Sequence, residues 1–297
     1  YPVRPLTLVV PFPPGAATDV FARTAGKRMG ELMGQTIVVL NRDGASGAIG
    51  TEQVAKAAPD GYTLLWGSSG PLAISPVWTE KLPYDPLASF APVATVGQNP
   101  SLLAVSASTP FRSATDLFAA ARAKPGDTTY GSAGVGSIGH LVTEMMSAAA
   151  RVQMRHVPYK GASIAAIDLA GGQIQVMMSS YSTLSPFLKA EKVRLIAITS
   201  RQPHPAFPDV QPLIQLLPGF SSETWVGVFA PAGTSPRLVE RLNREISEIS
   251  STAELRALLE PDGMLPLAMT PPAFAARMSR ELEQWKQVAA AQKIVAE

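Results

Sequence analysis

The sequence contains no cysteine, which excludes disulfides, thiol nucleophiles and cysteine metal ligands together. Only 16% of its residues are charged and the formal net charge is +2, so its composition does not indicate a nucleic-acid partner. The longest apolar runs, such as Leu6–Phe12 and Arg194–Thr199, are as short as a strand, whereas a bilayer-spanning helix needs about 20 apolar residues. What is present is a chain of 297 residues, 46% hydrophobic, which is enough for one large or two medium folded domains.

Catalytic and metal-binding signatures are equally scarce. No HExxH, P-loop or EF-hand pattern occurs. The chain has three histidines, His140, His156 and His204, so a serine–histidine triad has few candidates for its base. Ser137 is a candidate nucleophile, but the nucleophile elbow needs glycine two positions before the serine, where this chain has Val135. A serine hydrolase is an alternative that lacks its motif.

Strand-like and helix-like segments alternate along the first part of the chain. Leu6–Val10 is an apolar, β-branched run typical of a strand buried on both faces. After a break at Pro11–Gly15, an apolar stripe over Thr18–Met33 predicts a helix, and strands Thr36–Leu40 and Tyr62–Trp66 follow. This β-loop-α rhythm predicts an α/β fold with a parallel sheet covered by helices.

The same rhythm returns in the middle of the chain and predicts a second α/β half. We expect the chain to cross between the halves near Asn99-Pro100 and again near Ser221–Trp225. The first lobe is then discontinuous, residues 1–99 with 225–297, and the second lobe is residues 100–224. Because two crossing segments can form a hinge that closes on a ligand, we expect the ligand cleft between the lobes.

Ligands of open α/β sheets bind at the carboxyl ends of the strands, where four loops are predicted here. In Phe12–Asp19, small residues allow close backbone approach, and the N–H groups of the following helix favour an anion. Asp19 suits the helix dipole or could cap the helix, and a tight strand-to-helix turn is the structural alternative. The second loop combines Ser46–Gly50 with Ser68–Gly70.

The glycine-rich third loop, Ser132–His140, is the most suggestive. Ser132 and Ser137 supply hydroxyls at a helix N-terminus, so neutral donors there could bind a carboxylate without any arginine. The alternative is a glycine-rich turn on which Ser137 caps the helix. His140 lies one turn into that helix, where it either reaches a ligand or is a structural histidine.

Part of this loop also matches the dinucleotide-binding pattern GxGxxG, at Gly134, Gly136 and Gly139. That pattern needs an acidic residue about 20 positions later, but the first acid after Arg155 is Asp168, in the next predicted helix. An NAD(P)-dependent oxidoreductase therefore stays an alternative with half of its motif. Otherwise we expect no cofactor and no metal.

The fourth loop, Tyr159–Ser163, follows the next strand. Tyr159 could wall a pocket and Lys160 could attract an acid, although a lysine on a loop is usually only solvated. Ser179–Ser182 follows a further strand and adds hydroxyls from the same side, including that of Ser180.

In this order, the loops resemble the substrate-binding proteins of tripartite tricarboxylate transporters, also called the Bug family, nearly end to end. The motifs that carry the resemblance are Val9-Val10-Pro11-Phe12-Pro13-Pro14-Gly15 with Asp19 and Arg23, Asn41-Arg42-Asp43-Gly44-Ala45-Ser46-Gly47 with Gly50, Pro59-Asp60-Gly61-Tyr62-Thr63-Leu64, Leu82-Pro83-Tyr84-Asp85, Tyr130-Gly131-Ser132-Ala133-Gly134-Val135-Gly136-Ser137, Val157-Pro158-Tyr159-Lys160-Gly161 and Trp225-Val226-Gly227-Val228-Phe229-Ala230-Pro231-Ala232-Gly233-Thr234.

The resemblance implies a type II periplasmic binding protein fold, a Venus flytrap of two lobes, with no catalytic step. It implies a processed signal peptide, a periplasmic location, membrane transporter subunits as partners and a monomer that is not embedded in the membrane. The ligand would be a di- or tricarboxylate, an amino acid or an aromatic acid, gripped from opposite sides by Phe12–Asp19 and Ser132–Ser137. A sensory receptor that presents its ligand to a membrane protein is equally compatible.

The sequence departs from the family pattern at Ala16, Gln175 and Gln215-Leu216, where the family commonly has Gly, Asp and Glu, so the identity of the ligand does not transfer. The candidate ligand-binding residues are Phe12, Pro14, Gly15, Ala16, Ala17, Asp19, Ser68, Ser69, Ser132, Gly134, Gly136, Ser137, His140, Tyr159 and Ser180.

Overall fold

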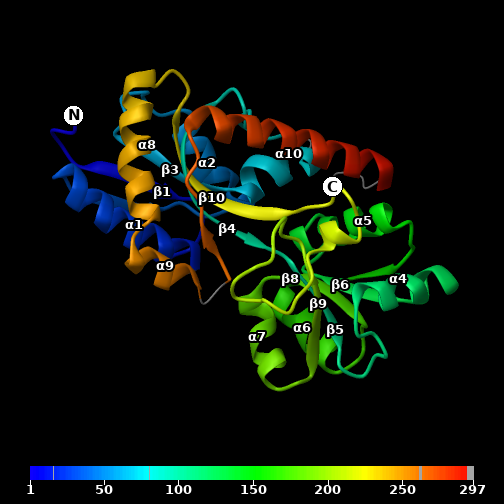
Figure 1. The fold of residues 1–297 in the computed structure, drawn as a ribbon. Coiled ribbons are helices and arrows are strands. Elements are labelled where there is room, and N and C mark those ends of the chain that lie inside the picture. Colours follow the sequence, from blue (N-terminus) through cyan, green and yellow to red (C-terminus); the bar gives the residue numbers. More distant parts are fainter. Residues whose placement is uncertain (16, 80, 261–262, 293–297) are drawn as a thin grey trace. The chain divides into compact units, whose positions relative to one another are not determined.

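The computed structural model describes residues 1–15, 17–79, 81–260 and 263–292. The chain forms two compact units, each built around its own sheet (Figure 1). Unit 1 consists of Tyr1–Gln98, Thr224–Glu260 and the chain from Met264 on, and unit 2 of Asn99–Glu223 with a short segment that ends at Gly263. Each unit is described by itself below.

Unit 1 contains a six-stranded sheet with the strand order β11-β4-β10-β3-β1-β2. Its strands are β1 (Leu6–Val10), β2 (Ile37–Asn41), β3 (Thr63–Ser68), β4 (Phe90–Pro100), β10 (Glu223–Pro231) and β11 (Leu265–Pro266). β1 pairs in parallel with both β2 and β3, whereas β10 pairs antiparallel with β3. The carboxyl ends of β1, β2 and β3 therefore lie along one edge of this sheet.

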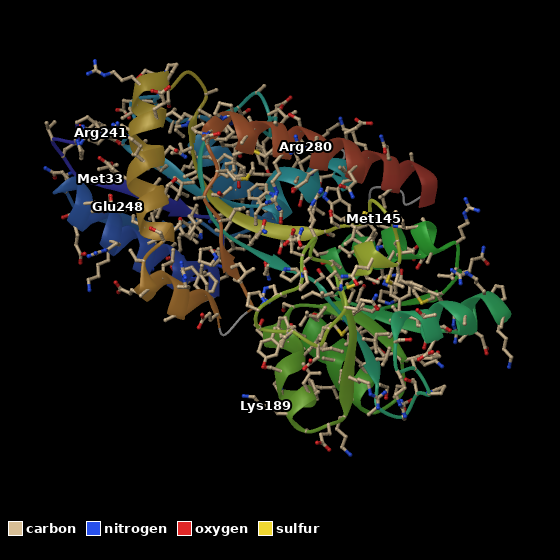
Figure 2. The ribbon with its side chains drawn as sticks, viewed as in Figure 1. Met33, Met145, Lys189, Arg241, Glu248 and Arg280 are labelled. Atoms are coloured by element: carbon tan, nitrogen blue, oxygen red, sulfur yellow. The ribbon has the colours of Figure 1, made fainter. Side chains whose placement is uncertain are left out.

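Helices cover both faces of the unit 1 sheet. They are α1 (Ala17–Met33), α2 (Ala48–Ala55), α3 (Ser75–Trp78), α8 (Pro236–Ser250), α9 (Ala253–Leu259) and α10 (Pro271–Gln292). Leu6, Leu8 and Val10 of β1 are fully buried and share one core cluster with residues of α1, α8 and α9. Met33, labelled in Figure 2, belongs to this cluster at the C-terminal end of α1. α1 ends where Gly34 adopts φ 65°, the left-handed conformation in which glycine commonly follows a helix C-terminus.

Unit 2 contains a five-stranded sheet with the strand order β7-β6-β8-β5-β9. Its strands are β5 (Leu102–Ser106), β6 (Thr129–Ser132), β7 (Arg155–Pro158), β8 (Val176–Ser179) and β9 (Val193–Ile198), and its helices are α4 (Ala114–Ala123), α5 (Ile138–Ala150), α6 (Ala162–Ala170) and α7 (Tyr181–Lys189). β6 pairs in parallel with β7 and β8, so the carboxyl ends of these three strands also share one edge. α6 and α7 pack on the buried side chains Leu102 and Met177, and their Leu169 and Leu184 complete that core cluster.

The expectation of parallel sheets was only partly right, because both sheets are mixed. β5 runs antiparallel to both of its neighbours, β8 and β9. It follows β4 after the single residue Ser101, with no helix between them. Parallel neighbours are usually joined by a crossover helix, but β4 belongs to the other sheet and both neighbours of β5 lie far along the chain, so no such unit sets the direction of β5. The parallel rhythm holds where helices separate the strands, and those are the strands that carry the predicted loops.

Candidate functional site

In unit 1, a buried ionic network holds the loop between β1 and α1. The Asp19 side chain is only 3% exposed, and its Oδ2 accepts hydrogen bonds from the Gly15 N–H at 2.9 Å and from Arg23 Nε at 3.0 Å. Its Oδ1 accepts from Asn41 Nδ2 at 2.8 Å. The same Asn41 nitrogen donates to the Phe12 carbonyl at 3.0 Å. Asp19 thus joins the first loop to the end of β2.

This network also fixes the charge of Asp19. Burial by itself raises the pKa of the carboxyl, but hydrogen bonds from Arg23, Gly15 and Asn41 outweigh burial and hold that pKa below its usual value. Both carboxylate oxygens already have partners within the protein. The geometry therefore favours Asp19 as a positioning group for the loop, and its contact with a ligand stays a prediction.

The loop after β2 has an unusual left-handed backbone. Gly44, Ala45, Ser46 and Gly47 all have positive φ, at 121°, 46°, 53° and 93°. The left-handed region costs a non-glycine residue roughly 1–2 kcal/mol, and such strain gathers at functional loops. Sequence reasoning placed Ser46 near the site, but nothing in the sequence signals the strained conformation of Ala45 and Ser46.

Ser68 and Ser69 lie at the carboxyl end of β3, on the same edge of the sheet. Ser68 is the last residue of the strand and is half-buried, whereas Ser69 is 4% exposed. Because β1 pairs in parallel with both β2 and β3, the edge brings together the residues that end or follow these strands: Phe12, Pro14, Gly15, Asn41, Ser68 and Ser69. Ala17 begins α1, and Ala16 lies outside the described residues.

In unit 2, the loop between β6 and α5 is held mainly by its own hydrogen bonds. Ser137 Oγ donates to the Gly134 carbonyl at 2.7 Å and accepts from the His140 N–H at 3.4 Å, so Ser137 is the N-cap of α5, which the sequence offered as the structural alternative to a ligand contact. Gly134 and Gly136 adopt φ 122° and 75°, conformations that glycine reaches without strain. A Cβ at Gly136 would meet no atom within 4 Å, so the backbone there faces open space. Neither a positive nor a negative side chain occurs in the Ser132–Ser137 loop.

Ser132 is fully buried and lies within hydrogen-bond distance of His156, with 2.7 Å between Ser132 Oγ and His156 Nε2. Its hydroxyl oxygen also accepts from the Gly134 N–H at 3.1 Å. A serine–histidine contact is half of a hydrolase triad, but a serine without solvent exposure cannot attack a substrate. Ser132 therefore orders the loop, and its direct contact with a ligand stays a prediction.

Three rings pack together beside this loop. The ring centroids of His140 and His156 are 4.1 Å apart with 14° between their planes, and those of Tyr130 and His156 are 4.9 Å apart. The Tyr130 hydroxyl donates to Glu144 of α5. Burial lowers the pKa of His140, and burial together with the neighbouring His140 lowers the pKa of His156 to about 4. Both imidazoles are therefore neutral at neutral pH.

Sequence reasoning missed His156. It faces Tyr130 in the parallel register of β6 and β7, and residues so paired lie on the same face of the sheet. The scarcity of histidine is the one signal that could have drawn attention to it, because only three occur in the chain.

Tyr159 and Ser180 follow the neighbouring strands of unit 2 at the same edge. The Tyr159 hydroxyl donates to Asp168 Oδ2 at 2.7 Å, and burial together with this carboxylate raises the pKa of Tyr159 to about 12. Ser180 Oγ lies 3.1 Å from the hydroxyls of both Ser182 and Thr183. Lys160 is exposed. The edge of unit 2 thus carries hydroxyls and backbone groups, as predicted, with no buried cation among these residues.

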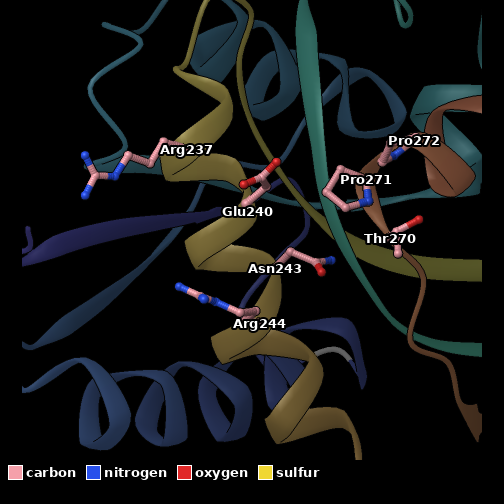
Figure 3. A pocket seen from close by; sticks show the side chains of 7 residues that line it. All are labelled: Arg237, Glu240, Asn243, Arg244, Thr270, Pro271 and Pro272. Carbon is pink, nitrogen blue, oxygen red and sulfur yellow. The ribbon is translucent and has the colours of Figure 1, made fainter.

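Other possible sites are few. Within the described part of the chain, no three His, Asp or Glu side chains are grouped so that they could hold a metal ion. No described helix has the length and apolar composition of a membrane span. A hollow of about 540 Å³ in unit 1, between α8 and the start of α10, contains none of the predicted ligand residues (Figure 3). It is lined by Arg237, Glu240, Asn243, Arg244, Thr270, Pro271 and Pro272.

The family to which the sequence belongs follows from comparison with known proteins. Residues 21–294 match the family described as tripartite tricarboxylate transporter family receptor. The chain belongs to this family. It is 39% identical over 97% of its length to a protein encoded in the tcbD-tcbE intergenic region of Pseudomonas sp. (strain P51), covering 86% of that protein. It is 34% identical over 96% of its length to BugT of Bordetella pertussis, covering 88% of that protein.

Solved structures agree with the family. A TctC solute-binding protein from Polaromonas, solved without ligand, has a TM-score of 0.88 at 29% identity, with 98% of this chain and 99% of that chain covered. An R. palustris protein solved with adipate has a TM-score of 0.81 at 33% identity, with 99% of each chain covered. MatC from Rhodopseudomonas palustris, with bound malate, has a TM-score of 0.76 at 31% identity, with 97% of this chain and 99% of that chain covered.

These likenesses decide between the classes of function that the sequence left open. The predicted periplasmic binding protein fold is confirmed. Members of the family are periplasmic solute-binding proteins and not enzymes, which removes the hydrolase and oxidoreductase alternatives. The glycines that match the dinucleotide pattern have structural roles instead. Gly134 and Gly136 take positive φ, and a Cβ at Gly139 would lie 2.6 Å from the Met178 carbonyl oxygen.

Proposed function

We propose that this protein captures a small organic carboxylate in the periplasm and delivers it to a tripartite tricarboxylate-type membrane transporter. The observation that carries the proposal is the Ser132–Ser137 loop, which has no charged side chain, opens its backbone at Gly136 and leads into the N-terminus of α5. Related proteins have been solved with adipate and with malate, both dicarboxylates. The ligand class is therefore a carboxylate held by neutral donors.

The binding strength of such a site can be estimated from its parts. Hydrogen bonds to a charged group contribute roughly 1.5–3 kcal/mol each, and a helix N-terminus adds about 0.3–1 kcal/mol. Two helix starts, those of α1 and α5, with two or three such bonds support roughly micromolar binding once the costs of association are subtracted. Because Asp19 and Ser132 already have partners within the protein, we assign the ligand contacts chiefly to exposed hydroxyls and to backbone N–H groups other than those of Gly15, Gly134 and Gly136, which donate to side chains of the protein.

We further propose that one ligand engages the loops of both units and that the units close on it as the lobes of a Venus flytrap. The carboxyl edges of the two sheets carry equivalent sets of loops, which supports this proposal. Small-angle scattering tests it, since a saturating ligand is expected to reduce the radius of gyration. Protein that has been unfolded and refolded should be used, so that retained ligand does not hide the change.

The function is tested with a panel of dicarboxylates, tricarboxylates, amino acids and aromatic acids. A ligand that binds only the folded state stabilises it by RT ln(1 + [L]/Kd), about 2.7 kcal/mol at a hundredfold excess over Kd. We expect a thermal shift with at least one acid, followed by a 1:1 calorimetric titration, and none with nucleotides or divalent metals. A shift with NAD(P) and none across the acids would contradict the proposal.

A further inference from the structure

The two imidazoles beside the Ser132–Ser137 loop hold backbone N–H groups of that loop. The Gly136 N–H donates to His140 Nδ1 at 3.1 Å, which requires that nitrogen to carry no proton. His156 Nε2 lies 2.7 Å from Ser132 Oγ, and this oxygen accepts from the Gly134 N–H at 3.1 Å. His140 therefore orients Gly136 directly, and His156 orients Gly134 through Ser132.

The packing of the two rings opposes a positive charge on both of them. Their centroids are 4.1 Å apart, and His140 is only 6% exposed, so two imidazolium ions here would repel one another with little solvation. A proton on His140 Nδ1 would also displace the Gly136 N–H. The conformation of the loop at Gly136 is thus tied to the neutral form of His140, and His156 packs against that ring.

On the described elements that carry or flank the pair, the other titratable groups are bonded elsewhere or exposed. On β6 the facing titratable group is Tyr130, and on α5 it is Glu144, which accepts the Tyr130 hydroxyl proton in a hydrogen bond. On β7, Arg155 precedes His156 in the strand, so it points to the opposite face, and it is exposed. Lys160, in the loop before α6, is exposed as well.

We infer that His140 and His156 are positioning residues for the ligand loop and that they act as neutral imidazoles, fixing the glycine N–H groups without lending charge to the bound anion. This inference rests on the proposed function and concerns the same site. It predicts a pH dependence of ligand affinity opposite to that of a site in which a charged histidine pairs with the anion. A histidinium that paired with the carboxylate would strengthen binding as the pH falls through about 6.5. A neutral support leaves affinity unchanged near neutral pH and weakens it as the pH falls toward about 4, where His156 gains a proton.

The binding test uses adipate and malate as probes, titrated by calorimetry across this pH range. His140→Asn keeps an acceptor for the Gly136 N–H and is expected to bind within about twofold of the parent at pH 7. His140→Leu removes the acceptor and is expected to bind about fivefold to tenfold more weakly while remaining folded by circular dichroism. The double variant His140→Asn with His156→Gln controls for protonation of the ligand itself, and the parent should lose more affinity than this variant as the pH falls toward about 4. His204→Gln, which removes the third histidine, should keep the parent's pH profile.

A ligand-free measurement keeps the inference testable if the leucine variant does not fold or neither probe binds. Nitrogen-15 NMR of the free protein should show His140 protonated at Nε2 and bare at Nδ1 at neutral pH, with the Gly136 amide protected from exchange in the parent and in His140→Asn. A protonated Nδ1, binding that strengthens as the pH falls through 6.5, or parent-like affinity in a folded His140→Leu would overturn the inference. If the parent binds no acid of the wider panel, the proposed function fails instead, whatever the histidine spectra show.

Discussion

The two units fix equivalent loops with opposite chemistry. In unit 1, the loop after β1 is held by an ionised Asp19 that bonds to Arg23 and Asn41. In unit 2, the loop after β6 is held by neutral groups, with Ser132 and Gly136 bonded to His156 and His140. In both units the polar side chains that hold the loop already have hydrogen-bond partners within the protein. The comparison indicates that these side chains shape the loops by accepting hydrogen bonds from the N–H groups of Gly15, Gly134 and Gly136, so that an anion would meet other N–H groups at the starts of α1 and α5.

We expect the largest effect from removing the ionised Asp19, which holds the loop of unit 1. Asp19→Ala leaves the Gly15 N–H, the Arg23 guanidinium and the Asn41 amide without their shared acceptor. We expect unfolding to become easier by about 2–3 kcal/mol, because buried donors lose a charged partner. Urea unfolding followed by tryptophan fluorescence measures this, since all four tryptophans lie in unit 1.

A matched control for Asp19 lies on the same helix. Glu31 pairs with Arg28 at the surface of α1, where its side chain is 46% exposed. Glu31→Ala should change stability by less than about 1 kcal/mol, as exposed ion pairs do. Equal losses in the two variants would show that the Asp19 network has no special role.

The two units should lose stability at different pH values as the solution is acidified. The pKa values of His140 and His156 lie below 6.5 in the folded state, so their neutral forms favour folding above pH 6.5, and this stability is lost as the pH falls toward about 4. The pKa of Asp19 is also lowered, so its contribution persists to about pH 4, the unfolded pKa, and is lost only below it. Unit 2 should therefore loosen first. All three histidines lie in unit 2, so their NMR signals report it while tryptophan fluorescence reports unit 1. If unit 1 unfolds before unit 2 on acidification, the proposed difference between the two units is wrong.

A smaller effect is expected from a substitution that changes only the backbone conformation and the space at Gly136, in the Ser132–Ser137 loop. Gly136 and Gly126 have φ 75° and 80°, and a Cβ at either would meet no atom within 4 Å. Gly136→Ala and Gly126→Ala should each cost about 1 kcal/mol of stability, through the same left-handed strain. Only Gly136→Ala is expected to weaken carboxylate binding, by roughly tenfold, because its methyl group enters the space that the ligand needs. Equal affinities of the two variants in calorimetry would place the site elsewhere.

A further pair of variants concerns the cap of α5. Ser137→Ala and Ser113→Ala each remove a serine N-cap, from α5 and α4 respectively, and each should lower stability by about 1 kcal/mol. Ser137 also holds the Gly134 carbonyl, so its loss should loosen the loop and weaken ligand binding by roughly 1–3 kcal/mol. Ser113→Ala should bind like the parent. If calorimetry shows both variants binding alike, Ser137 is only a cap.

The features that the sequence predicted well are local in the chain. The buried run Leu6–Val10 and the cap at Ser137 depend on neighbouring residues: the run occurs as expected, and the cap is the structural alternative that the sequence offered. The antiparallel strand β5 was missed, because its direction depends on partners far along the chain. The same reason hid the Asp19–Asn41 bond and the stacking of His140 on His156, since parallel pairing creates both.

Backbone amide NMR of the isotope-labelled protein, titrated with the acid that gives the largest thermal shift, tests the central claim most directly. We expect amides of the Ser132–Ser137 loop and the first turn of α5 to shift together with those of the first turn of α1, all with one Kd of roughly micromolar size. A ligand that binds while the amides of these loops stay unchanged, with shifts confined to charged side chains elsewhere, would contradict it.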